Sequence, residues 1–223
     1  HICFYGDYDV DGITATSVYL SFFGGLGAQV RAYVPHRLRE GYGLNLDAVQ
    51  RLHDEGISLL VTSDCGTTSH KEIALAARLG MDVVVTDHHQ TDEEMPPAVA
   101  VLNPHRAGAL YPFRGLCSAA LAYKVAQAYQ SRYGAGGVPL ESLLDLVALA
   151  TVADVVPLQD ENRSFVREGL VQLSRGARCG VRALKQVAGV TQDCTAETIA
   201  YKLAPRINAA GRLDDAMLGV RLL

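Results

Sequence analysis

Three clusters of acidic residues each follow a short apolar segment of the sequence. They are Asp7, Asp9 and Asp11 after residues 2–5, Asp64 after residues 57–63, and Asp87-His88-His89 after residues 81–86. Short apolar runs rich in β-branched or aromatic residues are typical of buried parallel strands. The carboxyl ends of parallel strands lie along one edge of a sheet, so we expect the clusters to meet there. Crowded carboxylates repel one another unless cations hold them, and the pattern therefore predicts a metal centre.

The first cluster lies in G-D-Y-D-V-D-G, where the three acids alternate along the chain. An extended or gently turning segment would project all three to one side, and the flanking glycines would permit a tight exit into a helix expected over residues 13–26. The spacing also matches the start of an EF-hand loop, but such a loop needs a bidentate Glu where this sequence has Val18. Taken alone, the segment also fits a solvated acidic turn that caps a helix.

The other two clusters gain meaning from their position relative to the first. Asp64 alone is typical of a turn, but between the other clusters it could bridge two cations. Adjacent histidines at a strand end point to opposite sides, so we expect at most one of them to bind a given ion. We assign His88 as the ligand and His89 as a hydrogen-bond partner or substrate contact. Without the acidic clusters, a pair of histidines would more often be ordinary polar residues of the surface or core that bind no ligand.

A further carboxylate, Asp154, ends the nearly all-apolar helix expected over residues 140–153. A carboxylate on a buried helix needs a partner, and a salt bridge or a helix cap is the alternative to a metal. Carboxylates with one or two imidazoles suit Mn²⁺ or Mg²⁺, and the imidazole favours Mn²⁺. Two ions about 3.5–4 Å apart that share a carboxylate would activate water and clamp a phosphoryl group for in-line displacement.

Three basic segments could hold that phosphoryl group. They are residues 35–43, 103–106 and 205–212, and their candidate phosphate-binding residues are His36, Arg37, Arg39, His105, Arg206, Asn208 and Arg212. Arginine binds phosphate in a bidentate manner, and Asn adds a further donor. Each segment alone could equally be a solvated loop.

The elements that would position these residues alternate between strand and helix in the first hundred residues. We expect strands at 2–6, 29–34, 57–63, 82–86 and 99–102, with helices at 13–26, 47–55 and 69–79 between them. This order predicts an α/β fold with a doubly wound, mostly parallel sheet and flanking helices. A helical segment follows, with helices expected at 117–133, 140–153, 162–175, 180–188 and 196–204. We divide the chain into the sheet part (1–115), a helical part that carries Asp154 (116–204), and a linker or start of a truncated domain (205–223).

Composition is that of an ordinary globular protein. Hydrophobic residues make up 49% and charged residues 20%, and no apolar stretch approaches the roughly 20 residues of a membrane helix. The five cysteines form no C-x-x-C pair, which favours a reducing cytoplasm over a disulfide framework. The net charge of −4 leaves nucleic-acid binding open, because cations bound at an acidic site would reverse its local field. The start at His1 without Met leads us to expect a fragment of a longer protein.

The ordered set of motifs resembles the DHH phosphoesterase superfamily and, within it, the RecJ-type single-strand exonucleases of bacteria. The motifs are G-D-Y-D-V-D-G (6–12), P-H-R-L-R-E-G-Y-G (35–43), V-T-S-D-C-G (61–66), V-T-D-H-H (85–89), T-V-A-D-V-V-P-L (151–158) and P-R-I-N-A-A-G-R-L (205–213). The resemblance implies a 5′→3′ exonuclease on single-stranded DNA that releases mononucleotides in recombination and repair. It implies two Mn²⁺ or Mg²⁺ ions, and a helicase and a single-strand-binding protein as partners.

The resemblance also implies roles for individual residues. The implied metal ligands are Asp9, Asp11, Asp64, His88 and Asp154, with Asp64 bridging. Asp7, Asp87 and His89 are similar to supporting or substrate-contacting groups, and Arg206, Asn208 and Arg212 match the segment that engages the nucleic-acid backbone. The family's second catalytic-side domain and its OB-fold are absent from these 223 residues, which puts independent DNA affinity in doubt.

Two rival functions remain open. Relatives that act on oligoribonucleotides, cyclic dinucleotides or pyrophosphate typically open with a His-x-x-Pro-Asp-x-Asp motif, whereas this chain has Gly6-Asp7-Tyr8-Asp9. The rival from another class is a non-catalytic replication or repair scaffold, which would be expected to have lost ligands. Every motif residue of this half is intact here.

Overall fold

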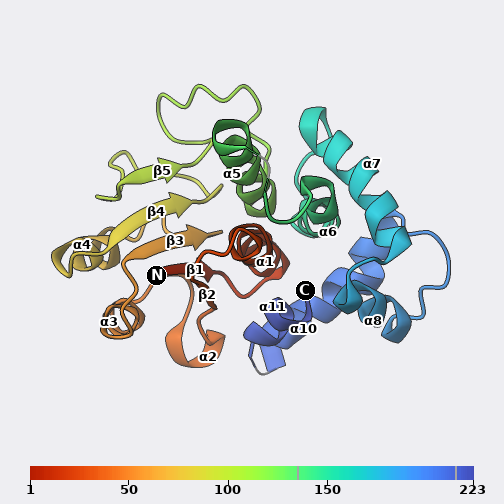
Figure 1. The fold of residues 1–223 in the computed structure, drawn as a ribbon, viewed down its shortest axis with the longest axis horizontal. Coiled ribbons are helices and arrows are strands. Elements are labelled where there is room, and N and C mark those ends of the chain that lie inside the picture. Colours follow the sequence, from red (N-terminus) through yellow and green to blue (C-terminus); the bar gives the residue numbers. More distant parts are fainter. Residues whose placement is uncertain (135, 214) are drawn as a thin grey trace.

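A five-stranded, fully parallel sheet forms the centre of the N-terminal half (Figure 1). The computed structural model describes residues 1–134, 136–213 and 215–223. The strands are β1 (Ile2–Gly6), β2 (Val30–Tyr33), β3 (Leu59–Ser63), β4 (Asp82–Thr86) and β5 (Ala100–Leu102), in the spatial order β2-β1-β3-β4-β5. The predicted α/β class is confirmed, and β3 lies between β1 and β4 as the bridging role of Asp64 requires.

Helices cover both faces of the sheet because neighbouring strand residues point to opposite sides. On one face, Phe4 and Val61 pack with α1 (Val10–Gly25), α5 (Ser118–Tyr133) and α6 (Leu144–Ala153). On the other face, Tyr5 and Leu60 pack with α3 (Leu46–Asp54) and α4 (His70–Arg78). Asn45 caps α3 as the sequence suggests, since its side chain accepts a hydrogen bond from the Ala48 backbone N. The sheet is therefore doubly wound (Figure 1).

The second half of the chain is helical. Beyond α5 and α6 it contains η1 (Leu140–Leu143), α7 (Asp160–Arg175), α8 (Cys179–Val187), α9 (Ala196–Thr198), the π-helical segment η2 (Ile199–Leu203), α10 (Ala204–Leu213) and α11 (Met217–Leu222), and a short helix α2 (Arg37–Glu40) lies in the first half. None of the described helices is long and apolar enough to cross a membrane.

Two expected boundaries were wrong. Helix α1 begins at Val10 rather than at residue 13, because Asp9 acts as its N-cap and accepts a hydrogen bond from the Gly12 backbone N. The acidic segment is therefore extended only as far as Asp9, and Asp11 lies in the first helical turn. The last expected helix does not stop at 204, since helical structure continues through η2 and α10 to Leu213. The P-R-I-N-A-A-G-R segment is consequently helical and not a loop.

The C-terminal helices pack against the start of α1. A Cβ atom on Gly211 would lie 2.5 Å from the Tyr8 carbonyl oxygen, and one on Gly219 would lie 2.9 Å from Cδ1 of Ile13. Both positions admit only glycine without displacement of a neighbour. Helices α10 and α11 therefore lie beside the acidic segment and the first turn of α1. The expected division of the chain at residues 115 and 204 stays a prediction.

Candidate metal centre

The register of the sheet aligns the residues that follow four neighbouring strands. Gly6 pairs with Ser63, Ser63 with Thr86, and Thr86 with Leu102. The next residues continue this alignment through backbone hydrogen bonds: Asp7 N donates to Ser63 O, Asp64 N to Thr86 O, and Asp87 N to Leu102 O. Three carboxylates from segments up to 80 residues apart thus occupy one line along the carboxyl edge, as the sequence predicted.

His88 projects an unpartnered ring nitrogen into a group of carboxylates. Its Nε2 lies 3.2 Å from Asp64 Oδ1 and 3.6 Å from an oxygen of both Asp11 and Asp154. This buried nitrogen has no hydrogen-bond partner. A buried polar atom without a partner is costly, and three converging carboxylate oxygens beside a free imidazole nitrogen match the ligand set of a divalent cation. Asp11, His88 and Asp154 can each offer a ligand atom to one ion, with these atoms within 4.8 Å of one another.

A second group of ligands lies on the other side of Asp64. Asp7, Asp9 and Asp64 offer oxygens within the same 4.8 Å limit, and Oδ1 of Asp7 is buried without a partner. A third group consists of Asp64, His88 and His89, and it shares His88 with the first group and Asp64 with the second. These residues therefore form two adjacent candidate positions for a cation. In this geometry Asp7, which the sequence suggested only as a supporting group, is as available as Asp9.

The two histidines do not point to opposite sides, so that expectation was wrong. Their ring centroids lie 4.8 Å apart, and His89 Nδ1 lies 3.9 Å from Asp64 Oδ1. The alternation of a strand does not extend to them because β4 ends at Thr86. Beyond that point Oδ1 of Asp87 accepts hydrogen bonds from the backbone N of both His88 and His89, which curls the segment around the carboxylate.

Asp87 organises this segment and does not point at the acidic group. Its Oδ1 is 2.8 Å from Nδ1 of His89, and its Oδ2 accepts a hydrogen bond from the Thr67 backbone N. Although burial acts to raise its pKa, hydrogen bonds from His89 and Thr67 hold the pKa of Asp87 below its usual range. The same pairing raises the pKa of His89. Asp87 thus orients His89 and favours its protonated form beside the site.

The N-terminus of α5 supplies contacts that the sequence reasoning missed. The backbone N of Ser118 donates to Asp11 Oδ2 at 2.6 Å, and that of Ala119 donates to Asp11 Oδ1 at 2.8 Å. The Ser118 hydroxyl donates to Asp64 Oδ1 at 3.0 Å. The sequence predicts a helix that starts near residue 117. A helix that runs antiparallel to the strands must begin at the carboxyl edge of the sheet, so the predicted helix start could have placed its free amides at the site.

Crowding raises the proton affinity of the carboxylates. Burial, followed by the charge of Asp9, raises the pKa of Asp7 to about 7. Burial, followed by the charge of Asp11, raises the pKa of Asp154 to about 6. Burial also raises the pKa of Asp11 and, well above its ordinary value, that of Asp64. Such shifts are expected where carboxylates converge without a cation.

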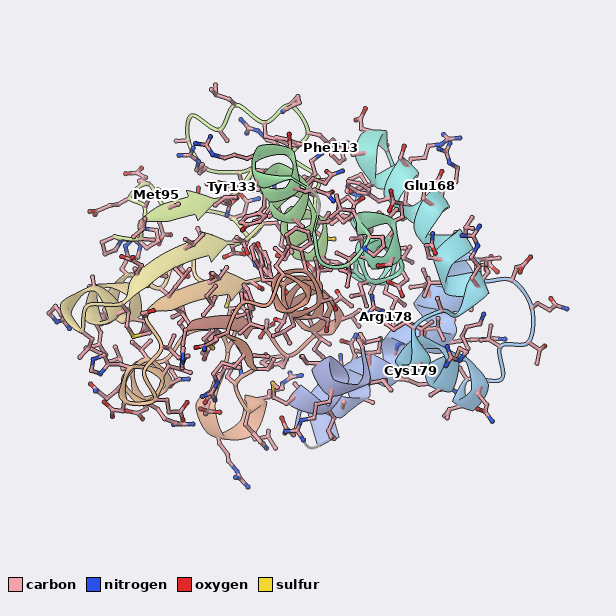
Figure 2. All side chains as sticks on the ribbon, in the orientation of Figure 1. Met95, Phe113, Tyr133, Glu168, Arg178 and Cys179 are labelled. Atoms are coloured by element: carbon pink, nitrogen blue, oxygen red, sulfur yellow. The ribbon has the colours of Figure 1, made fainter. Side chains whose placement is uncertain are left out.

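The two acids of α6 differ in their partners. Asp145 is buried and forms an ion pair with Arg178, whose Nε lies 2.9 Å from Oδ2. Arg178 also donates to the Leu223 carbonyl oxygen, and it lies between α6 and the C-terminal helices (Figure 2). Asp154, the C-cap residue at the other end of the helix, has no arginine or lysine partner among the described residues, and its Oδ2 lies 3.6 Å from Nε2 of His88.

The segment 35–43 lies beside the site through aromatic contacts. The Arg37 guanidinium stacks 5.0 Å above the Tyr8 ring, and Tyr42 makes edge contacts with both Tyr8 and His89. His36 caps α2 through Nδ1, which accepts a hydrogen bond from the Leu38 backbone N. Arg39 is exposed. Arg37 is thus the basic residue of this segment with a direct link to the acidic loop.

His105 also lies near the centre. Burial, followed by electrostatic interaction with His88 and Arg114, lowers the pKa of His105. Its backbone N donates to Asn103 Oδ1, and the Asn103 amide in turn donates to Thr67 Oγ1 and to the His89 carbonyl oxygen. Asn103 therefore fixes His105 relative to the histidine pair.

The three candidate residues of α10 have different surroundings. Asn208 Oδ1 accepts a hydrogen bond at 3.0 Å from the Val10 backbone N, so this residue joins α10 to the start of α1. Arg206 is exposed and donates at 2.6 Å to the carbonyl oxygen of Lys202 in the preceding segment η2. Arg212 is exposed. Six positions apart on a helix, the two arginines lie about 120° apart around its axis and do not form a single clamp.

The donor set fits manganese or magnesium. It consists of carboxylate oxygens with one or two imidazole nitrogens, and the candidate groups formed by the described residues contain no cysteine. Asp11, His88 and Asp154 would hold one ion, and Asp7, Asp9 and Asp64 the other. When bound, such ions supply Lewis-acid activation of a phosphodiester and of water.

Comparison with known proteins agrees with this geometry. Residues 1–151 match the model of the DHH family, N-terminal domain. The chain is 43% identical over all of its 223 residues to the single-stranded-DNA-specific exonuclease RecJ of Bacillus subtilis, covering 28% of that protein. It is 39% identical over 230 aligned residues to the RecJ of Escherichia coli, covering 98% of this chain and 40% of that protein.

Solved structures also show similarity to RecJ proteins. A crystal structure of exonuclease RecJ bound to manganese matches with a TM-score of 0.90 and 38% identity, over all of this chain and 56% of that one. RecJ from Thermus thermophilus in complex with Mn²⁺ matches with a TM-score of 0.86 and 35% identity, over all of this chain and 32% of that one. The chain thus spans well under two thirds of the relatives it matches. With its parallel sheet, aligned strand-end aspartates and D-H-H segment, the chain belongs to the DHH family.

Proposed function

We propose that this chain is the catalytic core of a metal-dependent, single-stranded-DNA exonuclease that works from the 5′ end and releases mononucleotides. The observation that carries the proposal is the buried, unpartnered Nε2 of His88 facing three aspartates. Similarity to RecJ proteins over the whole chain supports the substrate class. The proposed ligands are Asp9, Asp11, Asp64, His88 and Asp154, with Asp7 available as a further one.

The proposed mechanism assigns separate tasks to the surrounding residues. Asp64, which can offer an oxygen both to the group with Asp7 and Asp9 and to the group with His88 and His89, would help to hold both Mn²⁺ or Mg²⁺ ions. His89, whose pKa is raised by its hydrogen bond to Asp87, would donate a hydrogen bond to a non-bridging phosphate oxygen. Arg37, at the start of α2, and His105, in the loop after β5, would contact the sugar-phosphate backbone of the DNA.

The setting follows from the same reasoning. We place the activity in DNA recombination and repair in a reducing cytoplasm, supported by five free cysteines. A helicase and a single-strand-binding protein are the partners that the RecJ resemblance implies. Parts of the relatives beyond this region would supply most of the DNA affinity, since the chain itself has a net charge of −4.

The direct test is a nuclease assay with Mn²⁺ on three substrates: a 5′-labelled DNA single strand, a short RNA and pyrophosphate. We expect metal-dependent release of labelled mononucleotide from the DNA alone. Preferential hydrolysis of RNA or pyrophosphate would move the chain to another DHH phosphoesterase class. Mn²⁺ binding without hydrolysis of any substrate would favour the scaffold alternative.

A further inference from the structure

Ser118 contacts both of the most deeply buried proposed ligands. It is the first residue of α5 and is fully buried, and Asp64 and Asp11 expose only 1% and 2% of their surface. Its hydroxyl donates to Asp64 Oδ1 and its backbone N donates to Asp11 Oδ2. One residue thus holds one carboxylate from β3 and one from α1, which lie 54 and 107 positions away in the sequence.

The backbone contacts to Asp11 follow from the geometry of a helix start. The first amides of a helix have no partner within it, and the N-cap residue Cys117 provides no side-chain hydrogen bond. Asp11 takes over this capping role from another helix, and its charge is favoured by the positive end of the α5 dipole. The Asp11 carboxylate is therefore fixed before any cation arrives.

The Asp64 carboxylate is held by a side-chain hydrogen bond instead, and its backbone conformation is unusual. Its φ of +68° lies in the left-handed region, which few residues other than Gly, Asn and Asp adopt. The hydroxyl of Ser118 reaches the oxygen of Asp64 that also lies closest to His88 Nε2. The hydroxyl therefore fixes the carboxylate in an orientation that faces His88 and can also serve the group formed with Asp7 and Asp9.

We propose that Ser118 is a positioning residue for the metal centre, which orients Asp64 through its hydroxyl and so raises the affinity for the divalent cation. This proposal rests on the proposed metal-dependent function and names a residue outside its ligand set. In the bound state the hydroxyl keeps its bond to Asp64 as an outer-shell donor. Loss of such donors typically lowers metal affinity about 10–100-fold.

The competing explanation is that the hydroxyl only satisfies a buried polar atom. In that case its loss would lower the stability of the metal-free and metal-bound states equally, and the affinity for the metal would not change. A positioning role changes the affinity itself. Metal affinity, measured without substrate, therefore separates the two explanations.

The test is Mn²⁺ titration of the protein, followed by electron paramagnetic resonance, with Ser118→Ala and Ser118→Gly as variants. Ser17→Ala is the matched control, because the Ser17 hydroxyl is equally buried but donates to the Ile13 carbonyl oxygen. We expect both Ser118 variants to bind Mn²⁺ about 10–100-fold more weakly, and the control to bind like the original protein. Circular dichroism in EDTA checks that each variant is folded.

Equal Mn²⁺ affinity of the folded Ser118 variants and the original protein would overturn the positioning role while leaving the proposed function intact. Failure of the original protein to bind Mn²⁺ would overturn the metal centre itself, and the positioning role with it. The two failures are distinguishable because one concerns the variants and the other the unmodified chain.

Discussion

Asn208 accepts a hydrogen bond from the backbone N of Val10, which precedes it by 198 positions and begins helix α1. The side-chain oxygen of Asn208 thus satisfies one of the free amides at the start of α1, directly beside Asp9 and Asp11. A residue expected to bind phosphate is engaged, through its oxygen, in holding the acidic segment. The contact ties the last helices of the chain to the first metal-binding motif.

The first prediction tests the hydrogen bond between Val10 and Asn208. Asn208→Ala leaves the Val10 amide without its partner and should lower stability by about 1 kcal/mol, or about 2–4 °C in melting temperature for a chain of this size. Asn208→Asp keeps the oxygen acceptor at the helix N-terminus, which offsets part of the repulsion from Asp9 and Asp11, so it should melt at a higher temperature than Asn208→Ala. Thermal melts of both variants decide the matter. If the Asp variant melts as early as the Ala variant, the acceptor role is wrong.

The second prediction concerns Asp64. Asp64→Asn should abolish Mn²⁺-dependent hydrolysis, because the amide cannot hold two cations together. Asn is preferred over Ala here, since it tolerates the left-handed backbone at φ +68°. In EDTA the variant should be at least as stable as the original, because one buried negative charge is removed from a repelling group. Turnover comparable to the original at saturating Mn²⁺ would refute the bridging role.

The third prediction is an unusual pH dependence of the metal-free protein. The folded-state pKa is about 7 for Asp7 and about 6 for Asp154, both above the ordinary value of 3.8. Groups with a raised pKa contribute stability that is fully present below their ordinary pKa and is lost as pH rises through the folded-state pKa. In EDTA the free energy of unfolding should therefore fall between about pH 4 and pH 7, by a few kcal/mol, since a tenfold change in proton affinity corresponds to about 1.4 kcal/mol.

Addition of Mn²⁺ should reverse this trend, because cations bind the deprotonated carboxylates and compete with protons. Urea denaturation at pH 5, 6, 7 and 8, with and without Mn²⁺, provides the measurement. Parallel pH profiles in the two series would contradict a cation site built from these acids.

The fourth prediction separates the two arginines of α10. Arg212→Lys and Arg212→Ala should slow DNA cleavage with Mn²⁺ affinity unchanged, if the planar guanidinium binds phosphate in a way that Lys cannot reproduce. Arg206 donates to the carbonyl oxygen of Lys202 in the preceding segment η2, so Arg206→Lys should alter cleavage less. Steady-state rates with melting temperatures form the test. Cleavage unaffected by Arg212→Ala would return that residue to a structural or solvent-exposed role.

The convergence of Asp7, Asp64 and Asp87 could be predicted because it depends on a rule that the sequence reveals: short apolar strands in βαβ order place their ends at one edge. The direction of the two imidazoles could not, since it depends on how Asp87 curls the chain after β4 through two backbone hydrogen bonds. The capping of α5 by Asp11 was also hidden, because nothing in Cys117-Ser118-Ala119 identifies the distant carboxylate that accepts hydrogen bonds from these amides. The predicted phosphate-binding role of Asn208 has the same weakness, because the sequence does not show whether a polar side chain faces solvent or a backbone amide.

The long reach of the contact between Val10 and Asn208 also has a consequence during synthesis of the chain. A ribosome adds about 5–20 residues per second, so Asn208 is made roughly 10–40 s after Val10. Asp154 and the α5 amides are likewise translated long after the acidic segment that they complete. A nascent chain therefore carries unassembled candidate ligands for many seconds, and the proposed metal centre is complete only late in translation.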